Sequence, residues 1–452
     1  MNMPFKPAAA ASIPEAEPAT PDPVSAEPLA AAGMAEADAA LTPSLDPIAA
    51  DAAAAPPAMS ASRTAVLGAI LVALGPISMA LYTPAMPTLV AAFGTTIATV
   101  KLTLTAYFTG FALAQLVCGP LSDAYGRRPV TLAFMLLYLV ASALALWAPT
   151  VDILLAARLL QGIGAAAGVA IARAIVRDLF TGQDAARIMN TIGIMLAIGP
   201  ALSPTIGGIT LELLGWHAIF GLMVLYGAVV IGLVMFAMPE TNRRPDPALV
   251  HPFRLIAVYG RLIVDPRFIV PSTVLGAGIG ALYALGTMLP FVLIDRAGLT
   301  PTQFGFGMMA QSLSFAAGGL IMRKLLIRFD ANRLVMPGIL LGLAAALVLA
   351  VLMRSVPPTF VTVMLPIGVY AFSLALIMPG PSTGALAPFP HMAGAAAALL
   401  GFMQMGGGLL GSLAAALFGD PVTAIGTILP AMMAIALAAA LLAPKAGQRT
   451  QS

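Results

Sequence analysis

The sequence predicts an all-α membrane protein with about twelve membrane-spanning helices in two bundles of six. Composition is the first indication, because 60% of the residues are hydrophobic and only 9% are charged, whereas soluble domains carry roughly 25% charged residues. Spacing is the second, because beyond Arg63 the apolar runs recur at about 20 residues, the length that crosses a bilayer. Spanning segments must satisfy their own backbone groups, so these runs are predicted to be helices.

The predicted spans form an N-terminal bundle over residues 64–237 and a C-terminal bundle over residues 268–443. A pseudo-two-fold axis is expected to relate the bundles, because a basic turn follows the second span of each one. The individual spans are 64–83, 99–119, 130–147, 152–175, 187–210, 216–237, 268–293, 304–325, 333–353, 358–380, 391–418 and 421–443.

The segments outside the bundles are predicted to be cytoplasmic. Residues 1–60 are rich in Ala and Pro and carry eight acidic residues against Lys6 alone, which predicts a disordered tail rather than a signal peptide. The rest of the chain holds 21 of the 22 Lys/Arg residues and 11 of the 19 Asp/Glu residues. These basic residues gather in the loops of one side, so that side, the central loop 238–267 and the tail 444–452 are predicted to face the cytoplasm.

We therefore expect a multi-pass protein of the cell inner membrane, monomeric and surrounded by lipids. Nucleic acid is not an expected partner, because the basic residues form no continuous face. Lys101, near the outer end of the second span, is expected to extend its amine to the membrane interface. A single cysteine, Cys118, and three distant histidines predict no disulfide, metal site or cofactor. A membrane enzyme is unsupported, because the spans contain no Ser–His pair or phosphate-binding loop.

The segment GPLSDAYGRRP places a carboxylate and two guanidinium groups at the end of the second span. Its first glycine is expected to permit close packing and its second a turn with positive φ. Its aspartate is expected to cap a neighbouring helix N-terminus, and one of its arginines to pair with an acid that follows the fourth span. The candidate residues are Gly119, Asp123, Gly126, Arg127, Arg128 and Asp178. A degenerate copy starts at Gly318, with Arg323 where the aspartate is expected.

Seven fixed positions of this segment resemble the loop between helices two and three of the major facilitator superfamily. The resemblance implies a latch that stabilises the outward-facing state, whereas the alternative is simple anchoring by positive charge. The fourth span resembles a second pattern of the superfamily, with Arg158 inside the span followed by Gln161. A charged residue inside a membrane is a functional hypothesis by default. Arg158 is expected to orient substrate or to bias a proton site; the alternative is a structural arginine bonded to backbone carbonyls.

The fifth span, GIMLAIGPALSPTIGG, resembles the antiporter motif of the superfamily. Its candidate residues are Gly193, Gly199, Pro200, Gly207 and Gly208. The proline bends a helix, and the glycines give a smooth surface for contact between the bundles. The resemblance implies export rather than import, and the alternative is a kink without directional meaning.

The end of the first span resembles the Bcr/CflA drug-resistance branch, through Tyr82, Pro84 and Pro87. That branch implies proton antiport, with an acidic residue two positions before the tyrosine as the candidate proton carrier. This chain has Ala80 there, and its remaining acids fall near predicted helix ends. Proton coupling is thus implied by the resemblance alone, and an uncoupled facilitator stays open as an alternative.

The predicted function is export of small amphipathic compounds, either drugs or endogenous metabolites, by alternating access of the two bundles. A sensor or scaffold with a transporter fold is the alternative from another class. Polar and aromatic side chains on the inner helices are expected to line a substrate cavity. Besides Arg158, these candidates are Tyr82, Tyr107, Phe111, Gln115, Tyr283, Gln311, Tyr370 and Gln404.

Overall fold

A computed structural model of the chain describes residues 58–242, 245–247 and 252–442. The predictions for the tail 444–452, for parts of the central loop and for almost all of the N-terminal tail lie outside these residues. Residues 58–60 of that tail are described. Met59 is buried, and the Ser60 hydroxyl accepts a hydrogen bond of 3.3 Å from the backbone N–H of Arg63. The first helix is therefore capped by a residue that the sequence assigned to the tail.

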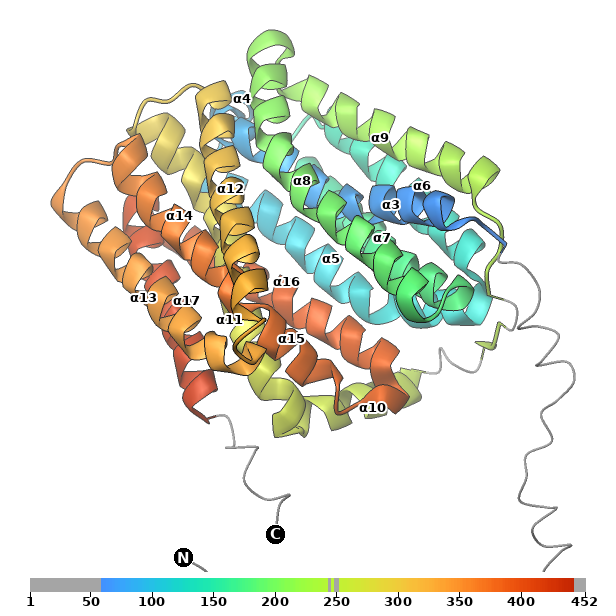
Figure 1. Cartoon of the computed structure of the whole chain (residues 1–452). Coiled ribbons are helices and arrows are strands. Elements are labelled where there is room, and N and C mark those ends of the chain that lie inside the picture. The colour runs from blue at the N-terminus through green and yellow to red at the C-terminus, as the bar shows by residue number, and fades with distance from the viewer. Residues whose placement is uncertain (1–57, 243–244, 248–251, 443–452) are drawn as a thin grey trace, which may run out of the picture. The chain divides into compact units, whose positions relative to one another are not determined.

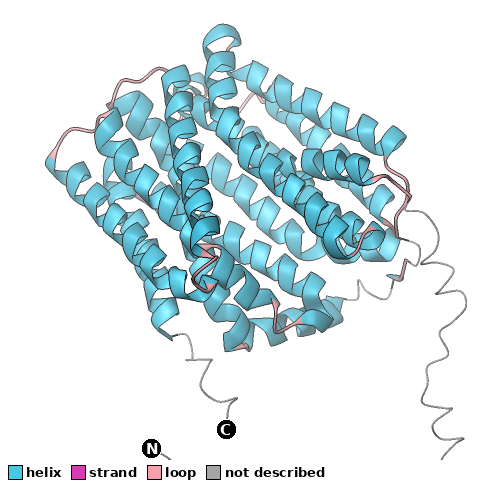
Figure 2. Ribbon diagram, viewed as in Figure 1, coloured by secondary structure: helices cyan, strands magenta, loops and turns pink. Residues whose placement is uncertain are grey.

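The prediction of twelve spans is confirmed, since the described residues contain twelve helical segments long and apolar enough to cross a membrane (Figure 1). Figure 2 shows helices joined by short loops, and no strand occurs in the described part of the chain. In chain order the spans are α3 (Ala61–Tyr82) with η1 (Thr83–Ala85) and α4 (Met86–Ala92), α5 (Ile97–Tyr125), α6 (Arg127–Leu146), α7 (Val151–Leu179), α8 (Gly182–Leu214), α9 (Trp216–Ala237), α11 (Pro266–Pro290) with η3 (Phe291–Arg296), α12 (Pro301–Leu325), α13 (Ala331–Ser355), α14 (Phe360–Ile377) with α15 (Pro379–Leu386), η4 (Pro390–Met392) with α16 (Ala393–Leu417), and α17 (Pro421–Leu442).

Local sequence signals set several helix boundaries. Thr96 and Thr150 accept hydrogen bonds from the backbone three residues ahead and so begin α5 and α7. Thr300 and Gln303 form a reciprocal capping box at the start of α12. Gly126 separates α5 from α6 with a φ of +97°, as its position in the turn predicted. Capping residues and one glycine thus set these helix boundaries, where the chain leaves the apolar region.

The central stretch contains a further helix that the sequence treated as a loop. Helix α10 (Pro252–Val264) packs near the start of α11, with Leu262 fully buried. The Tyr259 hydroxyl donates a hydrogen bond of 2.6 Å to the backbone oxygen of Leu116 on α5. Tyr259 and Leu262 hold this segment against the bundles, whereas Phe253, Ile256 and Val264 are exposed.

Two ends of the helix assembly can now be distinguished. We call the end that carries the α5–α6 turn the motif end, and the opposite end, which carries the α8–α9 turn at Gly215, the far end. Because the spans alternate in direction, α10 and the start of α16 lie at the motif end, whereas the start of α12 lies at the far end.

Each bundle has its own apolar core. One cluster of buried side chains, which includes Leu71 and Phe220, comes almost entirely from α3–α9, and a second, which includes Phe304 and Leu349, comes from the helices after α10. Large apolar side chains such as Phe236 point away from both cores, as expected of surfaces that face lipid.

The bundles meet along two helix pairs, α5 with α16 and α8 with α12, which lie side by side in Figure 1. At the far end Gly208 of α8 faces the backbone of Pro301, and Gly305 of α12 faces the backbone of Thr205. A β-carbon on either glycine would collide with the backbone opposite. Small residues therefore allow the close approach, since no hydrophobic force drives helices together within lipid.

Candidate functional site

Arg158 lies in the interior of the N-terminal bundle. It is on α7 and is fully buried. Helix α7 approaches α5 unusually closely at this level, because Gly162 and Gly110 each face the backbone of the other helix without room for a β-carbon. This approach brings the Arg158 side chain against Tyr107 of α5.

The Arg158 guanidinium is stacked between two aromatic rings. Its Cζ atom lies 4.4 Å from the ring centroid of Tyr82 and 4.4 Å from that of Tyr107, a cation–π arrangement. Its Nη1 donates to the side-chain oxygen of Gln161. Its Nε and Nη2 have no hydrogen-bond partner. One edge of the group is thus satisfied and the other is not.

Neutral polar groups surround this guanidinium. Gln161 Nε2 donates to Ser142 Oγ at 2.7 Å, and Ser142 donates in turn to the backbone oxygen of Tyr138 at 2.7 Å. The Tyr138 and Ser78 hydroxyls are 2.5 Å apart. These bonds hold Gln161, and with it Arg158, in one orientation. No carboxylate forms an ion pair with Arg158 among the residues that the structure describes.

Buried charge in the described residues is entirely cationic. The buried charged side chains are those of Lys101, Arg127 and Arg158, and no Asp or Glu is buried in the parts of the chain that the structure describes. Asp152, Glu212 and Asp295, which lie near helix ends at the far end, are exposed.

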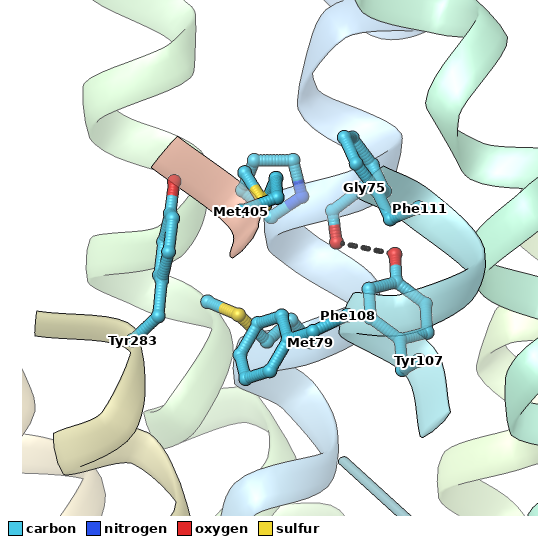
Figure 3. A pocket seen from close by; sticks show the side chains of 8 residues that line it. Gly75, Met79, Tyr107, Phe108, Phe111, Tyr283 and Met405 are labelled. Carbon is cyan, nitrogen blue, oxygen red and sulfur yellow. Dashed lines mark hydrogen bonds between the residues drawn. The ribbon is translucent and has the colours of Figure 1, made fainter. Parts of the chain in front are cut away.

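A small cavity lies where both bundles meet (Figure 3). The enclosed space has room for roughly one water molecule. Tyr107 is the lining residue whose ring also stacks on Arg158, and its hydroxyl donates to the Gly75 oxygen at 2.9 Å. The lining comprises Gly75, Pro76 and Met79 of α3, Tyr107, Phe108 and Phe111 of α5, Tyr283 of α11 and Met405 of α16.

Three of the residues predicted to line a cavity, Tyr107, Phe111 and Tyr283, line this one. The other five lie elsewhere. The Tyr82 ring lies against Arg158, and Gln115 lies against Gly401 between α5 and α16. Gln311 is buried on α12, Gln404 is half-buried on α16, and the Tyr370 hydroxyl donates to the Gly278 oxygen within the C-terminal bundle.

Sequence reasoning missed the contribution of the first helix to the cavity. Gly75 and Pro76 form a Gly-Pro pair within α3, and Met79 follows one turn later. A proline inside a spanning helix was the available signal, since it frees a backbone carbonyl and bends the helix. Phe108 was missed beside Tyr107 because a phenylalanine in an apolar run carries no signal of its own.

The motif end is organised around Arg127, whose side chain is buried. Its guanidinium pairs with Asp123, its Nε donates to Asp178 Oδ2 at 2.9 Å, and its Nη1 donates to Ser122 Oγ at 2.7 Å. Arg127 is therefore the arginine that meets Asp178, whereas Arg128 donates to the backbone oxygen of Met235 at 2.7 Å. Two carboxylates neutralise the buried charge.

Two details of this motif differ from expectation. The N-terminus of α6 is capped by Glu240, which accepts from the backbone N–H groups of Arg127 at 2.8 Å and Arg128 at 3.0 Å, and not by Asp123. Asp123, near the end of α5, instead pairs with the Arg127 side chain at the start of α6, across the turn at Gly126. A β-carbon on Gly119 would meet no atom within 4 Å, so close packing does not require glycine there.

The glycines of the fifth span face different partners. Gly199 and Gly207 lie against Ile77 and Leu81 of α3, inside the bundle, whereas Gly208 faces the other bundle. Gly193 has open space beside it. Pro200 lies inside α8, which continues through it.

The expectation that Lys101 reaches the membrane interface is wrong. Lys101 is fully buried, and its amine donates at 3.0 Å to the backbone oxygen of Ala415, across the contact between α5 and α16. Ala415 lies among the last four residues of α16, whose carbonyls lack partners within the helix and carry the negative end of its dipole. A backbone carbonyl at the end of α16, in the other bundle, therefore replaces water as the acceptor for the Lys101 amine.

Comparison with known proteins identifies the fold. A family model described as the Major Facilitator Superfamily matches residues 68–412. The uncharacterized MFS-type transporter YdgK of Bacillus subtilis (strain 168) is 31% identical over 369 residues, which cover 78% of this chain and 88% of that protein. The chloramphenicol resistance protein of Pseudomonas aeruginosa is 29% identical over 75% of this chain and 80% of its own length. Multidrug resistance protein D of Escherichia coli (strain K12) is 27% identical over 77% and 87%.

Solved structures agree on the architecture. The xylose transporter XylE of E. coli, in a partially occluded inward-open conformation, has a TM-score of 0.65 at 12% identity and covers 84% of this chain and 96% of its own. A bacterial homologue of the human lysosomal transporter Spinster, inward-facing and unoccupied, has a TM-score of 0.65 at 14% identity, over 84% and 95%. At such identities the likeness concerns the fold alone.

Proposed function

Since this chain belongs to the major facilitator superfamily, whose members are membrane transporters and not enzymes, we propose that it exports small amphipathic compounds across the cell inner membrane. The observation that carries the proposal is the cavity shared by both bundles. Its walls are aromatic and thioether side chains, with Tyr107 and Phe111 on one side and Tyr283 and Met405 on the other. Such walls suit an apolar ligand body, and rocking of the bundles would open the site to one side at a time.

Export is the proposed direction for two reasons. Relatives of this chain carry the printed names of chloramphenicol and multidrug resistance proteins, and export is one way to give such resistance. Helix α8 also carries the glycines that resemble the antiporter motif, and Gly208 lies in the contact between the bundles. We propose that the motif end, both termini included, faces the cytoplasm, as the basic residues there favour.

Two sets of residues receive roles in this proposal. The Arg127 cluster at the motif end is proposed as the conformational latch, together with Glu240 as its cap on α6. Arg158, oriented by Gln161, is proposed to act on the substrate through the wall at Tyr107. At the far end, the Gly208 contact and the bond between Lys101 and Ala415 would separate when the transporter opens outward.

The coupling of transport has two candidates. Proton antiport is the coupling that the resemblance to the Bcr/CflA branch implies. Uncoupled export is the alternative, and a specific observation favours it: Ala80 occupies the position of the usual acid, and no Asp or Glu is buried in the described residues. A carboxylate that carries a proton through the membrane would be expected in the interior.

The test of export is accumulation of a resistance-type panel, chloramphenicol included, by everted membrane vesicles that contain the chain. We expect accumulation above that of vesicles without it. Gly208→Ala places a β-carbon against Pro301 and should lower accumulation by about tenfold or more, since it prevents closure of the far end. Gly193→Ala, on the same helix with open space beside it, is the matched control and should leave accumulation unchanged. Equal accumulation with and without the chain, for every compound, would contradict export.

A further inference from the structure

The interior of the N-terminal bundle carries a positive charge that the protein leaves uncompensated. Arg127 is buried too, but two carboxylates contact it. Lys101 is bonded to a helix C-terminus, whose carbonyl groups carry the negative end of the helix dipole. Arg158 has neither a carboxylate nor a helix C-terminus as a partner, because its neighbours are two aromatic rings, a neutral amide and hydroxyl groups. An ion in this setting favours a partner of opposite charge.

The unsatisfied atoms of Arg158 define the shape of that partner. Nε–H and Nη2–H lie on one edge of the planar guanidinium and point the same way, and both lack an acceptor. A group with two oxygens in one plane can accept both bonds in parallel, which is the strongest arrangement that arginine forms. Carboxylate and sulfonate groups have this geometry.

The cavity and the guanidinium are separated by a single ring. Tyr107 lines the cavity with one part of its surface and stacks on Arg158 with its face. The hydroxyl of Tyr107 is held by the Gly75 oxygen, another lining group, as Figure 3 shows. A change in the bend of α3 at Gly75 and Pro76 would therefore release the ring and open a path from the cavity to the Arg158 guanidinium.

We infer that the substrate is an amphipathic organic anion. The Nε–Nη2 edge of Arg158 receives its carboxylate or sulfonate head, and its apolar body lies between the aromatic walls of the cavity after the bundles have rocked apart and widened it beyond its present room for one water. The inference rests on the proposed export function and specifies its substrate class. It also accounts for the absence of a buried acid from the described residues, because a carboxylate beside Arg158 would compete with the substrate head for the same edge.

An anionic substrate also changes what drives export. The cell interior is electrically negative, so each exported negative charge moves down the membrane potential. A potential of about 100 mV supports a gradient of about fiftyfold for a monovalent anion. Such a transporter needs no proton carrier, which agrees with Ala80 at the usual acidic position.

The test uses matched probes on naphthalene, biphenyl and decane scaffolds, each as the sulfonate, the neutral sulfonamide and the primary ammonium. Sulfonates stay ionised and do not cross lipid as neutral acids. Everted vesicles that contain the full chain are energised so that their lumen is positive and acidic. Valinomycin with K⁺ then removes the potential, and nigericin removes the pH gradient.

Three variants are compared with the wild type. Arg158→Gln removes the charge, and Arg158→Lys keeps the charge but lacks the edge that forms two parallel bonds. Arg354→Gln is a control at a far-end arginine bonded to backbone oxygens.

We expect the sulfonates to accumulate, valinomycin to abolish their accumulation and nigericin to leave it in place. Arg158→Gln should lower it by about tenfold or more, Arg158→Lys by less, and Arg354→Gln should match the wild type. Accumulation of sulfonamides or ammonium compounds without sulfonates would overturn the inference while transport stands. So would sulfonate accumulation that Arg158→Gln leaves unchanged, or that only nigericin abolishes. If no probe and no resistance compound accumulates, both the inference and the export proposal fail.

Discussion

Arg127 and Arg158 are buried arginines of the same bundle, one at the motif end and one in its interior, and the protein treats their charges in opposite ways. Arg127 contacts two carboxylates and a hydroxyl, so its charge is neutralised within the fold. Arg158 is stacked between two rings and leaves one edge of its guanidinium without a partner. The difference indicates that the first arginine holds the motif end together, as the proposed latch requires, whereas the second keeps its charge for a ligand.

The largest expected effect comes from removing the unpaired charge. Arg158→Gln should lower transport of a substrate by about tenfold or more without lowering the thermal midpoint, because it deletes a buried ion that has no counter-charge. Vesicle transport and thermal unfolding of the purified protein measure the two quantities. A large loss of stability would make Arg158 a structural residue like Arg127 and would remove the contrast.

A smaller effect is expected at the neutralised arginine. Asp178→Asn removes one of the two carboxylates from Arg127 and should destabilise the bundle by about 2 kcal/mol, because hydrogen bonds to charged groups contribute that much. Denaturation in lipid–detergent mixtures measures the change, with Asp184→Asn as a control in an exposed ion pair. Equal effects of the two substitutions would show that the Arg127 pair is no more important than a surface pair.

The cap on α6 should contribute less again. Glu240→Gln keeps one of the two oxygens that accept from the backbone N–H groups of Arg127 and Arg128, and it removes the charge from a helix N-terminus. We expect a loss of about 0.5–1 kcal/mol, which should decrease as salt is added. If the loss does not depend on salt, the contribution of Glu240 is not electrostatic.

The smallest effect is expected on the balance between the open and closed forms of the far end. Lys101→Met removes an ammonium group that is fully buried and has one acceptor. In the wild type, opening of the far end hydrates this charge, which stabilises the open form. Without the charge, we expect the closed form to be more populated. Spin labels on Trp147→Cys and Ser355→Cys, which report from the two bundles, measure the opening, with Cys118→Ser as background. A shift toward the open form would show that the bond to Ala415 outweighs the cost of burying the amine.

Much of the architecture could be predicted from the sequence. The number of spans and the position of the central stretch follow from run lengths, because the bilayer fixes the length of a spanning helix. The pairing between an arginine of the turn and Asp178 was expected from charge and location, and the structure shows which arginine it is. Gly126 was expected at positive φ, and its backbone has that conformation.

What could not be predicted depends on helix rotation and on contacts distant in sequence. A hydropathy pattern does not show whether Lys101 points to lipid or to α16, and the unpaired carbonyls of a helix end 314 residues away decide the outcome. The cap by Glu240 has the same character, since 113 residues separate it from Arg127. Tyr82 and Tyr370 looked like cavity residues from their type, yet each one points into its own bundle.

The central claim is that the unpaired edge of Arg158 receives a negatively charged head group. The most direct measurement is the equilibrium binding of naphthalene-2-sulfonate and of its neutral sulfonamide to the purified protein in lipid nanodiscs, by calorimetry, for the wild type and for Arg158→Gln. We expect the wild type to bind the sulfonate about tenfold or more tightly than the sulfonamide, and Arg158→Gln to abolish this preference. Equal affinity of the wild type for both compounds, or a preference that survives the substitution, would show that Arg158 does not receive an anionic head group.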